Sequence, residues 1–189
     1  MFVFLDFEAS SLSNHGYPIE VGWVFENGRE ESYLIRPAPG WDDWDERSEA
    51  IHGIDRATLE QEGVAPDLVA RRMVETLRGH DIRAGAPSWD GKWLGHLLRA
   101  GGYARHTLRL NGTDEALVDV ATAALAGTFE LTDARVLGRT LASAARAGSQ
   151  IAPRRHRALA DASEERRQWI EVRLAAEALR AEVRNLPAA

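Results

Sequence analysis

Two carboxylates stand at the end of the first apolar segment of the chain. Phe2 to Phe7 is a run of bulky residues that only Asp6 interrupts, and Glu8 follows at once. Residues i and i+2 of a strand project to the same face, so both carboxylates point one way from the rim of a sheet. Paired anions repel unless a cation lies between them, and hard oxygen ligands suit Mg²⁺ or Mn²⁺. A solvated strand edge is the competing interpretation, because 29 of the 189 residues are acidic.

His156 and Asp161 form a second pair, at the point where the last helix of the chain is expected to begin. A histidine in the loop and an aspartate one turn into the helix can face one cavity, with the carboxylate as a ligand and the imidazole as a base. The alternative is a surface histidine beside an aspartate that the helix macrodipole favours. Spacing alone favours this alternative.

A third acid, Asp90, lies in the first turn of a segment with one apolar helical face. A cap or a dipole interaction is the ordinary explanation for an acid at this position. Trp89 and Trp93 are four residues apart, and this spacing is typical of core packing. Taken by itself, the segment indicates no chemistry.

Together, these segments resemble the motifs of the DEDD 3'-5' exonucleases, in the branch whose third motif carries a histidine. That branch includes the proofreading subunit of bacterial DNA polymerase, ribonuclease T and oligoribonuclease. Asp6–Leu12 looks like the first motif of the family, Trp89–Leu94 like the second and His156–Ala162 like the third. Ile51–Ile54 is similar to an element found between the first and second motifs of many members. The resemblance extends from residue 2 to about residue 170.

The resemblance implies a metal-dependent 3'-5' exonuclease that releases nucleoside 5'-monophosphates from the 3' ends of single-stranded DNA or RNA. It also implies a two-metal mechanism with two divalent cations, Mg²⁺ or Mn²⁺. By the resemblance, Asp6 would bridge both ions, Glu8 and Asp161 would complete the site that activates water, and Asp90 would hold the second ion. His156 would be the general base that takes the proton of the water.

Substrate contacts follow from the resemblance in the same way. The residues expected to make them are Ala9, Ser10, Ser11, Leu12, Trp89 and Arg155. Leu12 would wedge beside the terminal base, with ordinary core packing as the alternative. Trp89, with Trp41 and Trp44, could stack on bases, although core packing competes for each of them. Arg155, with its neighbours Arg154 and Arg157, offers phosphate contacts, and a solvated arginine loop is the competing account.

The chain departs from the family pattern at two places. The second motif often carries a His-Asn pair shortly before its aspartate, where this chain has Gly85-Ala86. The first motif often continues Thr-Thr-Gly, where this chain has Ala9-Ser10-Ser11. The first departure puts side-chain contacts to the substrate near Ala86 in question. Neither departure changes a residue expected to bind metal.

Apolar periodicity predicts the elements that must position these side chains. Strands are expected over residues 2–7, 17–25, 30–36, 81–86 and 107–110. Asn27-Gly28 predicts a two-residue type I′ turn between the second and third strands. Helices are expected from 65 to 79, from 89 to 101, over 113–125, over 132–146 and from about 158 to 183. This order predicts an α/β domain with a mixed sheet. The resemblance implies a ribonuclease H-like five-stranded mixed sheet flanked by helices, in a single domain over residues 1–189.

Composition limits the function classes. The chain has no cysteine, which excludes disulfides, thiolate zinc sites, iron–sulfur clusters and a cysteine nucleophile. No segment approaches the roughly 18 uninterrupted apolar residues of a membrane span, and Met1 to Leu5 is too short for a signal-peptide core. We therefore expect a cytoplasmic protein with no membrane partner. The net charge of −6 does not indicate nucleic-acid binding, so local basic patches or bound cations would have to attract such a substrate.

Two other function classes stay open. One is a non-catalytic nucleic-acid-binding or scaffold module that retains the exonuclease fold; it predicts the loss of at least one metal-ligand type, and none is lost. The other is an unrelated acidic interaction protein built on the final helix, which would leave the two acid pairs far apart. The sequence does not predict DNA or RNA preference, processivity or pathway. A homodimer is one expected assembly, because members of the resembled family are often dimers.

Overall fold

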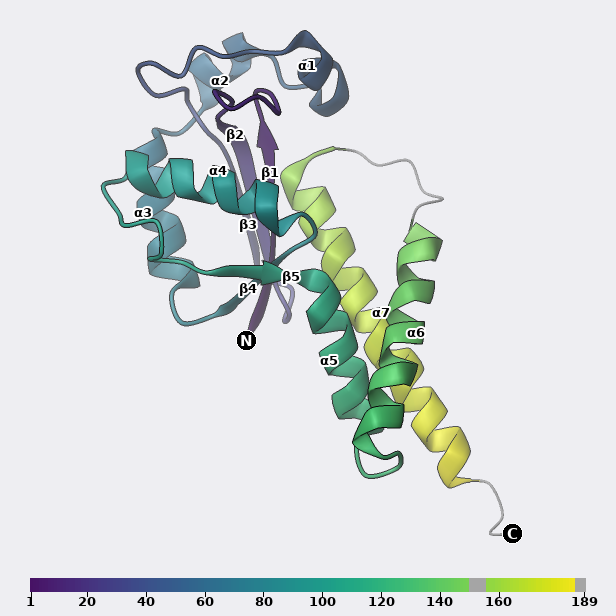
Figure 1. Ribbon diagram of the computed structural model, residues 1–189. Helices are drawn as coiled ribbons and strands as arrows, with labels where there is room; N and C mark the ends of the chain where they lie inside the picture. Colours follow the sequence, from purple (N-terminus) through teal and green to yellow (C-terminus); the bar gives the residue numbers. More distant parts are fainter. Residues whose placement is uncertain (150–155, 186–189) are drawn as a thin grey trace. The chain divides into compact units, whose positions relative to one another are not determined.

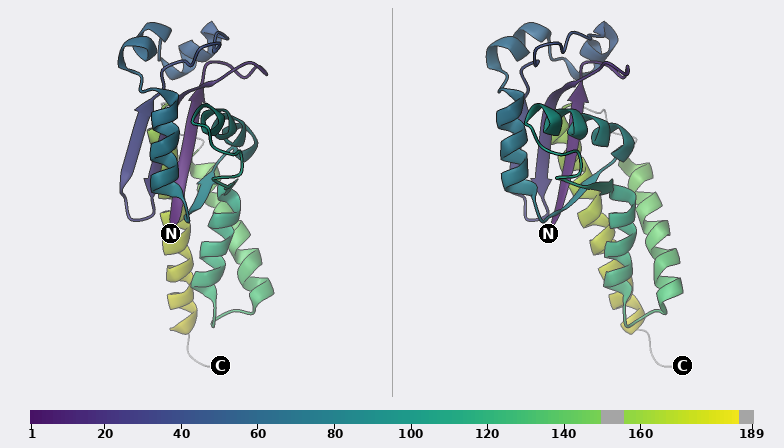
Figure 2. Two further views of the ribbon diagram at one scale, coloured as in Figure 1. Left: turned by 90° about the vertical axis from the view of Figure 1, so that its left-hand side faces the viewer. Right: turned by 60° about the vertical axis from the view of Figure 1, so that its left-hand side comes forward.

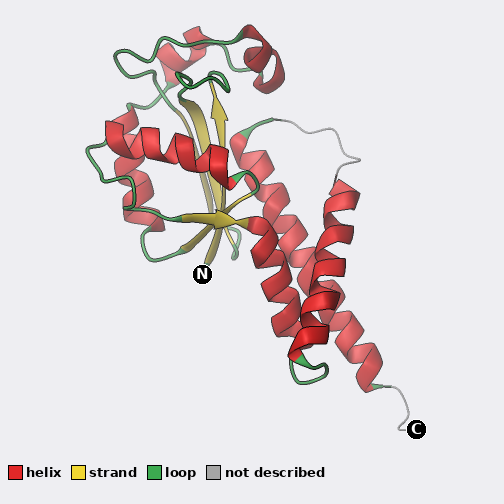
Figure 3. Ribbon diagram, viewed as in Figure 1, coloured by secondary structure: helices red, strands yellow, loops and turns green. Residues whose placement is uncertain are grey.

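The computed structural model describes residues 1–149 and 156–185, and its elements follow the predicted order (Figures 1 and 3). The strands are β1 (Phe2–Ala9), β2 (Pro18–Phe25), β3 (Glu30–Leu34), β4 (Asp81–Ala84) and β5 (Leu110–Gly112). The described helices are α1 (Glu46–His52), α2 (Arg56–Glu62), α3 (Pro66–Leu77), α4 (Pro87–Ala100), α5 (Thr113–Leu125), α6 (Leu131–Ser149) and α7 (Ala158–Arg184). The contacts expected of Arg154 and Arg155 lie outside the described residues.

The chain forms two compact units. The first comprises Met1–Asn111 with Arg154–Ser163, and the second comprises Gly112–Pro153 with Glu164–Ala189. The first unit holds the sheet, α1 to α4 and the first residues of α7, and the second holds α5, α6 and the rest of α7. One exonuclease domain over residues 1–189 stays a prediction.

A five-stranded mixed sheet forms the centre of the first unit, in the order β3-β2-β1-β4-β5. The pairs β1–β2 and β2–β3 are antiparallel, and β1–β4 is parallel. Helices α3 and α4 lie over one face of the sheet (Figure 2). The odd-numbered residues of β1 from 3 to 7 are buried in one core with apolar residues of these helices, among them Met73 and Leu97. Asp6 and Glu8 occupy alternate positions, so they lie on the opposite face of the sheet. The predicted mixed sheet is confirmed.

The helices that cover this core show the expected sequence signals. Pro66 and Pro87 stand in the first turns of α3 and α4, where a missing N–H is tolerated. In α4 the buried apolar residues Trp93, Leu94 and Leu97 recur at helical spacing. This face packs on the sheet and fixes the direction of α4, whose first turn carries Asp90.

The turn between β2 and β3 differs from the prediction. Gly28 has a φ of 91°, but Asn27 has no positive φ, and a type I′ turn needs positive φ at both central residues. Gly28 N–H donates to Phe25 O at 2.9 Å, and Phe25 N–H donates to Arg29 O at 2.8 Å. The connection is therefore a three-residue loop, in which a turn is followed by a left-handed glycine. The predicted type I′ turn is wrong because Asn27 does not adopt the positive φ that this turn requires.

Strand boundaries also differ. The first strand continues to Ala9 rather than ending at residue 7, and the fourth ends at Ala84 rather than at residue 86. The third strand ends at Leu34 rather than at Arg36, and Ile35 makes an isolated bridge with Val64. The strand expected over 107–110 is instead the short strand that begins at Leu110. The helices expected over 113–125, 132–146 and about 158–183 are confirmed to within a few residues.

Two short helices have no counterpart among the predicted elements, although an aspartate stands directly before each of them. Asp45 precedes α1 and accepts a hydrogen bond from the Arg47 N–H, and Asp55 precedes α2 and accepts one from the Thr58 N–H. An aspartate at this position satisfies a backbone donor that the first helical turn leaves without a partner. Gly53 ends α1 in the left-handed conformation, with a φ of 68°.

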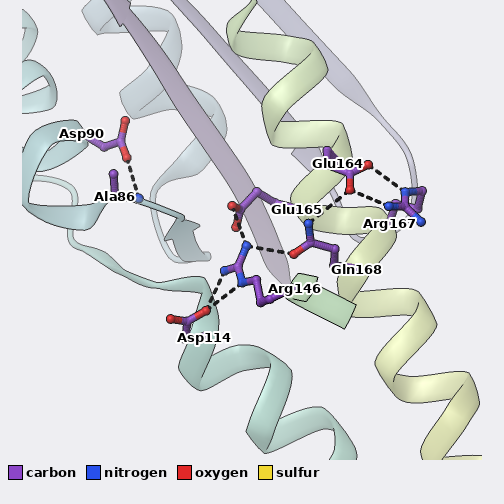
Figure 4. Close-up of polar contacts among 8 residues, drawn as sticks. All are labelled: Ala86, Asp90, Asp114, Arg146, Glu164, Glu165, Arg167 and Gln168. Atoms are coloured by element: carbon purple, nitrogen blue, oxygen red, sulfur yellow. Dashed lines mark hydrogen bonds and ion pairs between the residues drawn. The ribbon is translucent and has the colours of Figure 1, made fainter. Parts of the chain in front are cut away.

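Arg146 ties together the three helices of the second unit (Figure 4). From α6 it contacts Asp114 of α5 at 2.7 Å and Glu165 of α7 at 3.1 Å. It also donates to the Oε1 atom of Gln168 at 2.8 Å. Gln168 is buried, so this network replaces water at a polar site inside the helical unit. Among the described helices, none is both long enough and apolar enough to cross a membrane.

Candidate functional site

Three of the predicted metal-binding acids meet on the face of the sheet opposite α3 and α4. Asp6 and Glu8 come from β1, and Asp161 comes from the first turn of α7. One carboxylate oxygen of each residue lies within 4.8 Å of the others. We call these three residues the acidic cluster. Its existence excludes the alternative in which the two acid pairs lie far apart.

The close approach of α7 to β2 depends on a glycine. Gly22 stands opposite Asp6 in the β1–β2 register, and directly opposite residues share a face of the sheet. A Cβ atom at Gly22 would lie 2.3 Å from the backbone nitrogen of Leu159. Ala158, the first residue of α7, is fully buried. The absence of a side chain at position 22 therefore lets the helix backbone lie directly on the strand, one turn before Asp161.

Glu20 is a further acid beside the cluster, and we did not single it out from the sequence. It stands opposite Glu8 in the register and is only 4% exposed. Its carboxylate accepts hydrogen bonds from Arg157 at 2.6 and 3.0 Å and from the Ala158 N–H at 3.0 Å. The signal that could have found it is an acid inside an otherwise apolar strand, since such a residue must be paired. Arg157, expected as a phosphate contact, is thus bound to Glu20.

Asp90 lies outside the group of three but within electrostatic reach of it. It is 3% exposed, and its Oδ2 accepts a hydrogen bond from the Ala86 N–H at 3.3 Å (Figure 4). The capping role expected of an acid in this helical turn is therefore present. Its negative charge also raises the pKa of Glu8, so it contributes to the field of the acidic cluster.

The crowding of carboxylates perturbs Glu8 most clearly. Burial, and then the charges of Asp161 and Glu20, raise the pKa of Glu8 from its ordinary 4.5 to about 8, against the opposing effect of Arg157. Without a cation, Glu8 therefore holds a proton at neutral pH. A divalent cation would replace that proton and relieve the repulsion. The donors are hard carboxylate oxygens, which fit Mg²⁺ or Mn²⁺ rather than a soft metal.

His156 precedes Arg157 and has a φ of 42°. A residue with a side chain occupies this left-handed region at a cost of about 1 to 3 kcal/mol, which surrounding contacts must offset. The charge of His156 reaches His52, whose pKa is lowered chiefly by burial. His52 is 5% exposed, and its Nδ1 accepts a hydrogen bond from the Ile54 N–H at 3.1 Å. The Ile-His-Gly-Ile element thus lies near the start of α7 and is held in place by its own backbone.

The loop after β1 is held by its two serine hydroxyls. Ser10 is buried, and its Oγ accepts a hydrogen bond from the Tyr17 N–H at 3.1 Å. The Oγ of Ser11 donates to Asp43 and accepts from the Ser13 N–H at 3.1 Å. Both side chains are therefore used inside the protein, and so is the Ser10 backbone, whose N–H donates to the Tyr17 carbonyl and whose carbonyl accepts from the Asp45 N–H.

Two apolar side chains of the predicted substrate-binding set are exposed. Leu12 is 66% exposed, so ordinary core packing does not explain it. Trp89 is 42% exposed and stacks on Trp93 with ring centroids 6.1 Å apart. The Nζ of Lys92 lies 4.2 Å from the Trp93 ring centroid and donates to the Ser13 carbonyl. Lys92 thereby connects the start of α4 to the loop that carries Leu12.

Trp41 and Trp44 are less exposed than Leu12 and Trp89. Trp41 is half-buried and stacks on Tyr17, with ring centroids 5.2 Å apart. Trp44 is also half-buried and donates from its Nε1 to Glu49 at 2.7 Å. These contacts favour the packing interpretation for both residues.

The chain is similar to known proteins in structure but matches none in the sequence comparisons. No family model matches the chain, and no curated protein sequence matches it. Structures of Escherichia coli exonuclease I do match. The complex with a dA16 oligonucleotide has a TM-score of 0.62 at 16% identity, over 94% of this chain and 42% of that chain. The complex with dT13 has a TM-score of 0.61 at 16% identity, over 92% and 41%.

A zinc-bound form of the exonuclease I complex with single-stranded DNA matches as well, with a TM-score of 0.59 at 16% identity, over 97% of this chain and 41% of that one. This chain therefore spans about two fifths of the length of these exonucleases. At such identity the likeness concerns the fold, and the expected ribonuclease H-like fold is confirmed.

Proposed function

We propose that the chain is a metal-dependent 3'-5' exonuclease that hydrolyses single-stranded nucleic acid and releases nucleoside 5'-monophosphates. The observation that carries the proposal is the meeting of Asp6, Glu8 and Asp161 within 4.8 Å, from two elements far apart in the sequence. The fold shared with exonuclease I supports it, because those structures hold single-stranded oligonucleotides.

The acidic cluster, together with Asp90, would hold two divalent cations, Mg²⁺ or Mn²⁺. When bound, the cations supply a nucleophile at neutral pH and stabilise the charge on the leaving 3'-oxygen. His156 would take the proton of the attacking water at its imidazole. Asp90 would keep its hydrogen bond with the Ala86 N–H, which fixes the side chain in the first turn of α4.

Substrate would lie along the loop after β1 and the start of α4. The backbone from Ala9 through Ser10 and Ser11 would follow the terminal nucleotide, with Leu12 beside its base. Trp89 offers an exposed ring for a second base, and stacking of this kind tolerates any sequence. Arg155 would contact phosphate. Cytoplasmic location and assembly as a homodimer stay predictions.

The test uses the purified chain with single-stranded DNA and RNA, labelled at the 3' or the 5' end, with Mn²⁺ or with a chelator. We expect Mn²⁺-dependent release of labelled mononucleotide from the 3' label and a ladder of shortened products from the 5' label. Asp6→Asn should abolish both, whereas Asp67→Asn, at an exposed acid of α3, should change neither. Hydrolysis that survives the chelator, or no hydrolysis of any substrate, would refute the proposal.

A further inference from the structure

We propose that Glu20 is a positioning residue: with Arg157 it clamps the start of α7 onto β2 and thereby sets the position of His156 and Asp161. This inference rests on the proposed function for its catalytic meaning. The clamp itself is a structural claim, and it can be tested without nuclease activity.

The carboxylate of Glu20 is fully used. Its Oε1 accepts from Arg157 Nη2 at 2.6 Å, and its Oε2 accepts from Arg157 Nε at 3.0 Å. The same Oε2 accepts from the Ala158 N–H at 3.0 Å. That N–H belongs to the first turn of α7, where backbone donors have no partner within the helix. A buried strand residue therefore caps a helix whose first turn carries a cluster ligand.

The strand register places Glu20 on the same face of the sheet as the two acids of β1, so the contact with Arg157 also positions the start of α7 relative to them. Glu20 stands opposite Glu8, and Gly22 stands opposite Asp6, so all four positions share one face. The clamp holds the side chain of Arg157, and the Arg157 carbonyl accepts the Asp161 N–H at 3.0 Å. Asp161 is thus one helical turn from a residue that is fixed to the same sheet as the other two acids.

If Arg157 acted on the acidic cluster only through its charge, its removal would change the affinity for a divalent cation in the opposite direction. Arg157 is a cation near Glu8, so its removal makes the acidic cluster more negative and should tighten the binding of a divalent cation. If the pair acts by position, the same removal frees the start of α7 and weakens cation binding. The sign of the change in Mn²⁺ affinity therefore separates the two explanations.

The experiment compares Arg157→Met and Glu20→Gln with the wild-type chain. Mn²⁺ binding is measured by titration calorimetry with the metal alone, and amide hydrogen exchange is measured over residues 158–161. We expect both variants to bind Mn²⁺ about tenfold more weakly or worse, since partners that orient a ligand contribute on that scale. We also expect loss of amide protection in that turn, and a lower kcat with little change in KM.

The matched control is an ion pair of the same chemistry elsewhere in the first unit. Arg72 donates to Glu31 through Nε at 2.8 Å and Nη2 at 2.7 Å, on the surface between α3 and β3. Arg72→Met and Glu31→Gln should leave Mn²⁺ affinity and the exchange of residues 158–161 unchanged. Tryptophan fluorescence checks folding, and Arg157→Met is the safer variant because the Arg157 side chain is 49% exposed.

Unchanged amide exchange over residues 158–161 in a folded Arg157→Met variant overturns the proposal, as does Mn²⁺ affinity equal to or above that of the wild type. If the wild-type chain neither binds Mn²⁺ nor hydrolyses nucleic acid, the proposed function fails, and the exchange measurement still decides whether the clamp exists. Failure of the two ideas is therefore distinguishable.

Discussion

Replacing Glu8 with glutamine is expected to stabilise the metal-free protein at pH 8 and to change little near pH 4. The pKa of Glu8 is raised by burial and by neighbouring acids from 4.5 to about 8. Below pH 4.5 the carboxyl is protonated in both the folded and the unfolded chain. As the pH rises towards 8, only the unfolded chain loses the proton, so the free energy of unfolding of the wild type falls.

The slope of this loss is about 1.4 kcal/mol per pH unit, which gives about 5 kcal/mol over the whole interval. Glu8 is partly exposed, and water screens part of the repulsion from Asp161. We therefore expect Glu8→Gln to raise the free energy of unfolding by about 1 to 2 kcal/mol more at pH 8 than at pH 5. Glutamine carries no charge at either pH, so the variant does not lose this part of its free energy of unfolding as the pH rises.

The assay is urea unfolding in a chelator at pH 5 and pH 8, followed by tryptophan fluorescence. Five of the six tryptophans lie in the first unit with the acidic cluster, so the signal reports on that unit. Mn²⁺ at pH 8 should restore the stability of the wild type and have less effect on the variant, because binding to the folded state alone stabilises it. An equal pH dependence in the two proteins would refute the reasoning.

Glu31→Gln provides a control of opposite sign. The Arg72 guanidinium holds the pKa of Glu31 below its ordinary value. A lowered pKa stabilises the fold above pH 4.5, and this contribution is lost as the pH falls through the folded pKa. Glu31→Gln should therefore destabilise the protein slightly at pH 8, where Glu8→Gln stabilises it.

Three further substitutions test the site. Gly22→Ala places a Cβ 2.3 Å from the Leu159 nitrogen. It should lower the free energy of unfolding in urea by about 1 to 3 kcal/mol and weaken Mn²⁺ binding. Gly95→Ala, whose Cβ has no neighbour closer than 3.7 Å, should lower neither stability nor Mn²⁺ affinity. His156→Ala should lower the Mn²⁺-dependent rate about 10²-fold or more with cation binding retained; an unchanged pH–rate profile would exclude it as the base. Trp89→Ala should raise KM about tenfold with kcat little changed, as expected for a stacking contact of about 1 kcal/mol or more, and an unchanged KM would remove Trp89 from the substrate site.

The sequence predicted most of the elements because they depend on local spacing, whereas the approach of the acids was expected only from the resemblance to the exonuclease motifs. Asp6 and Glu8 share a face since strand residues alternate, and this holds whatever surrounds them. The start of the last helix could be read from its apolar residues, and that placed Asp161 in the first turn. The resemblance to the exonuclease motifs then implied that the end of the first strand meets the first turn of the last helix, and Asp6, Glu8 and Asp161 do lie together.

Gly22 was out of reach of this reasoning because its importance lies in a contact across the fold, and for Glu20 the sequence showed an acid in an apolar strand but not which residue pairs with it. A glycine within a strand does not reveal which backbone approaches it, and here it is Leu159. Three arginines surround His156 in the sequence, and only the tertiary structure shows that Arg157 belongs to Glu20. The prediction of the turn type at Asn27 was wrong for a related reason, since the Asn-Gly pair allows more than one loop length.

The alternation along β1 constrains how its gene can change. Apolar side chains at positions 3, 5 and 7 enter the core, whereas Asp6 and Glu8 lie on the opposite face in the acidic cluster. Deleting or inserting one residue within β1 ahead of Asp6 would put the acids on the same face as the apolar residues before the change, so that either carboxylates enter the core or apolar side chains face the acidic cluster. A change of two residues within the strand would preserve this alternation.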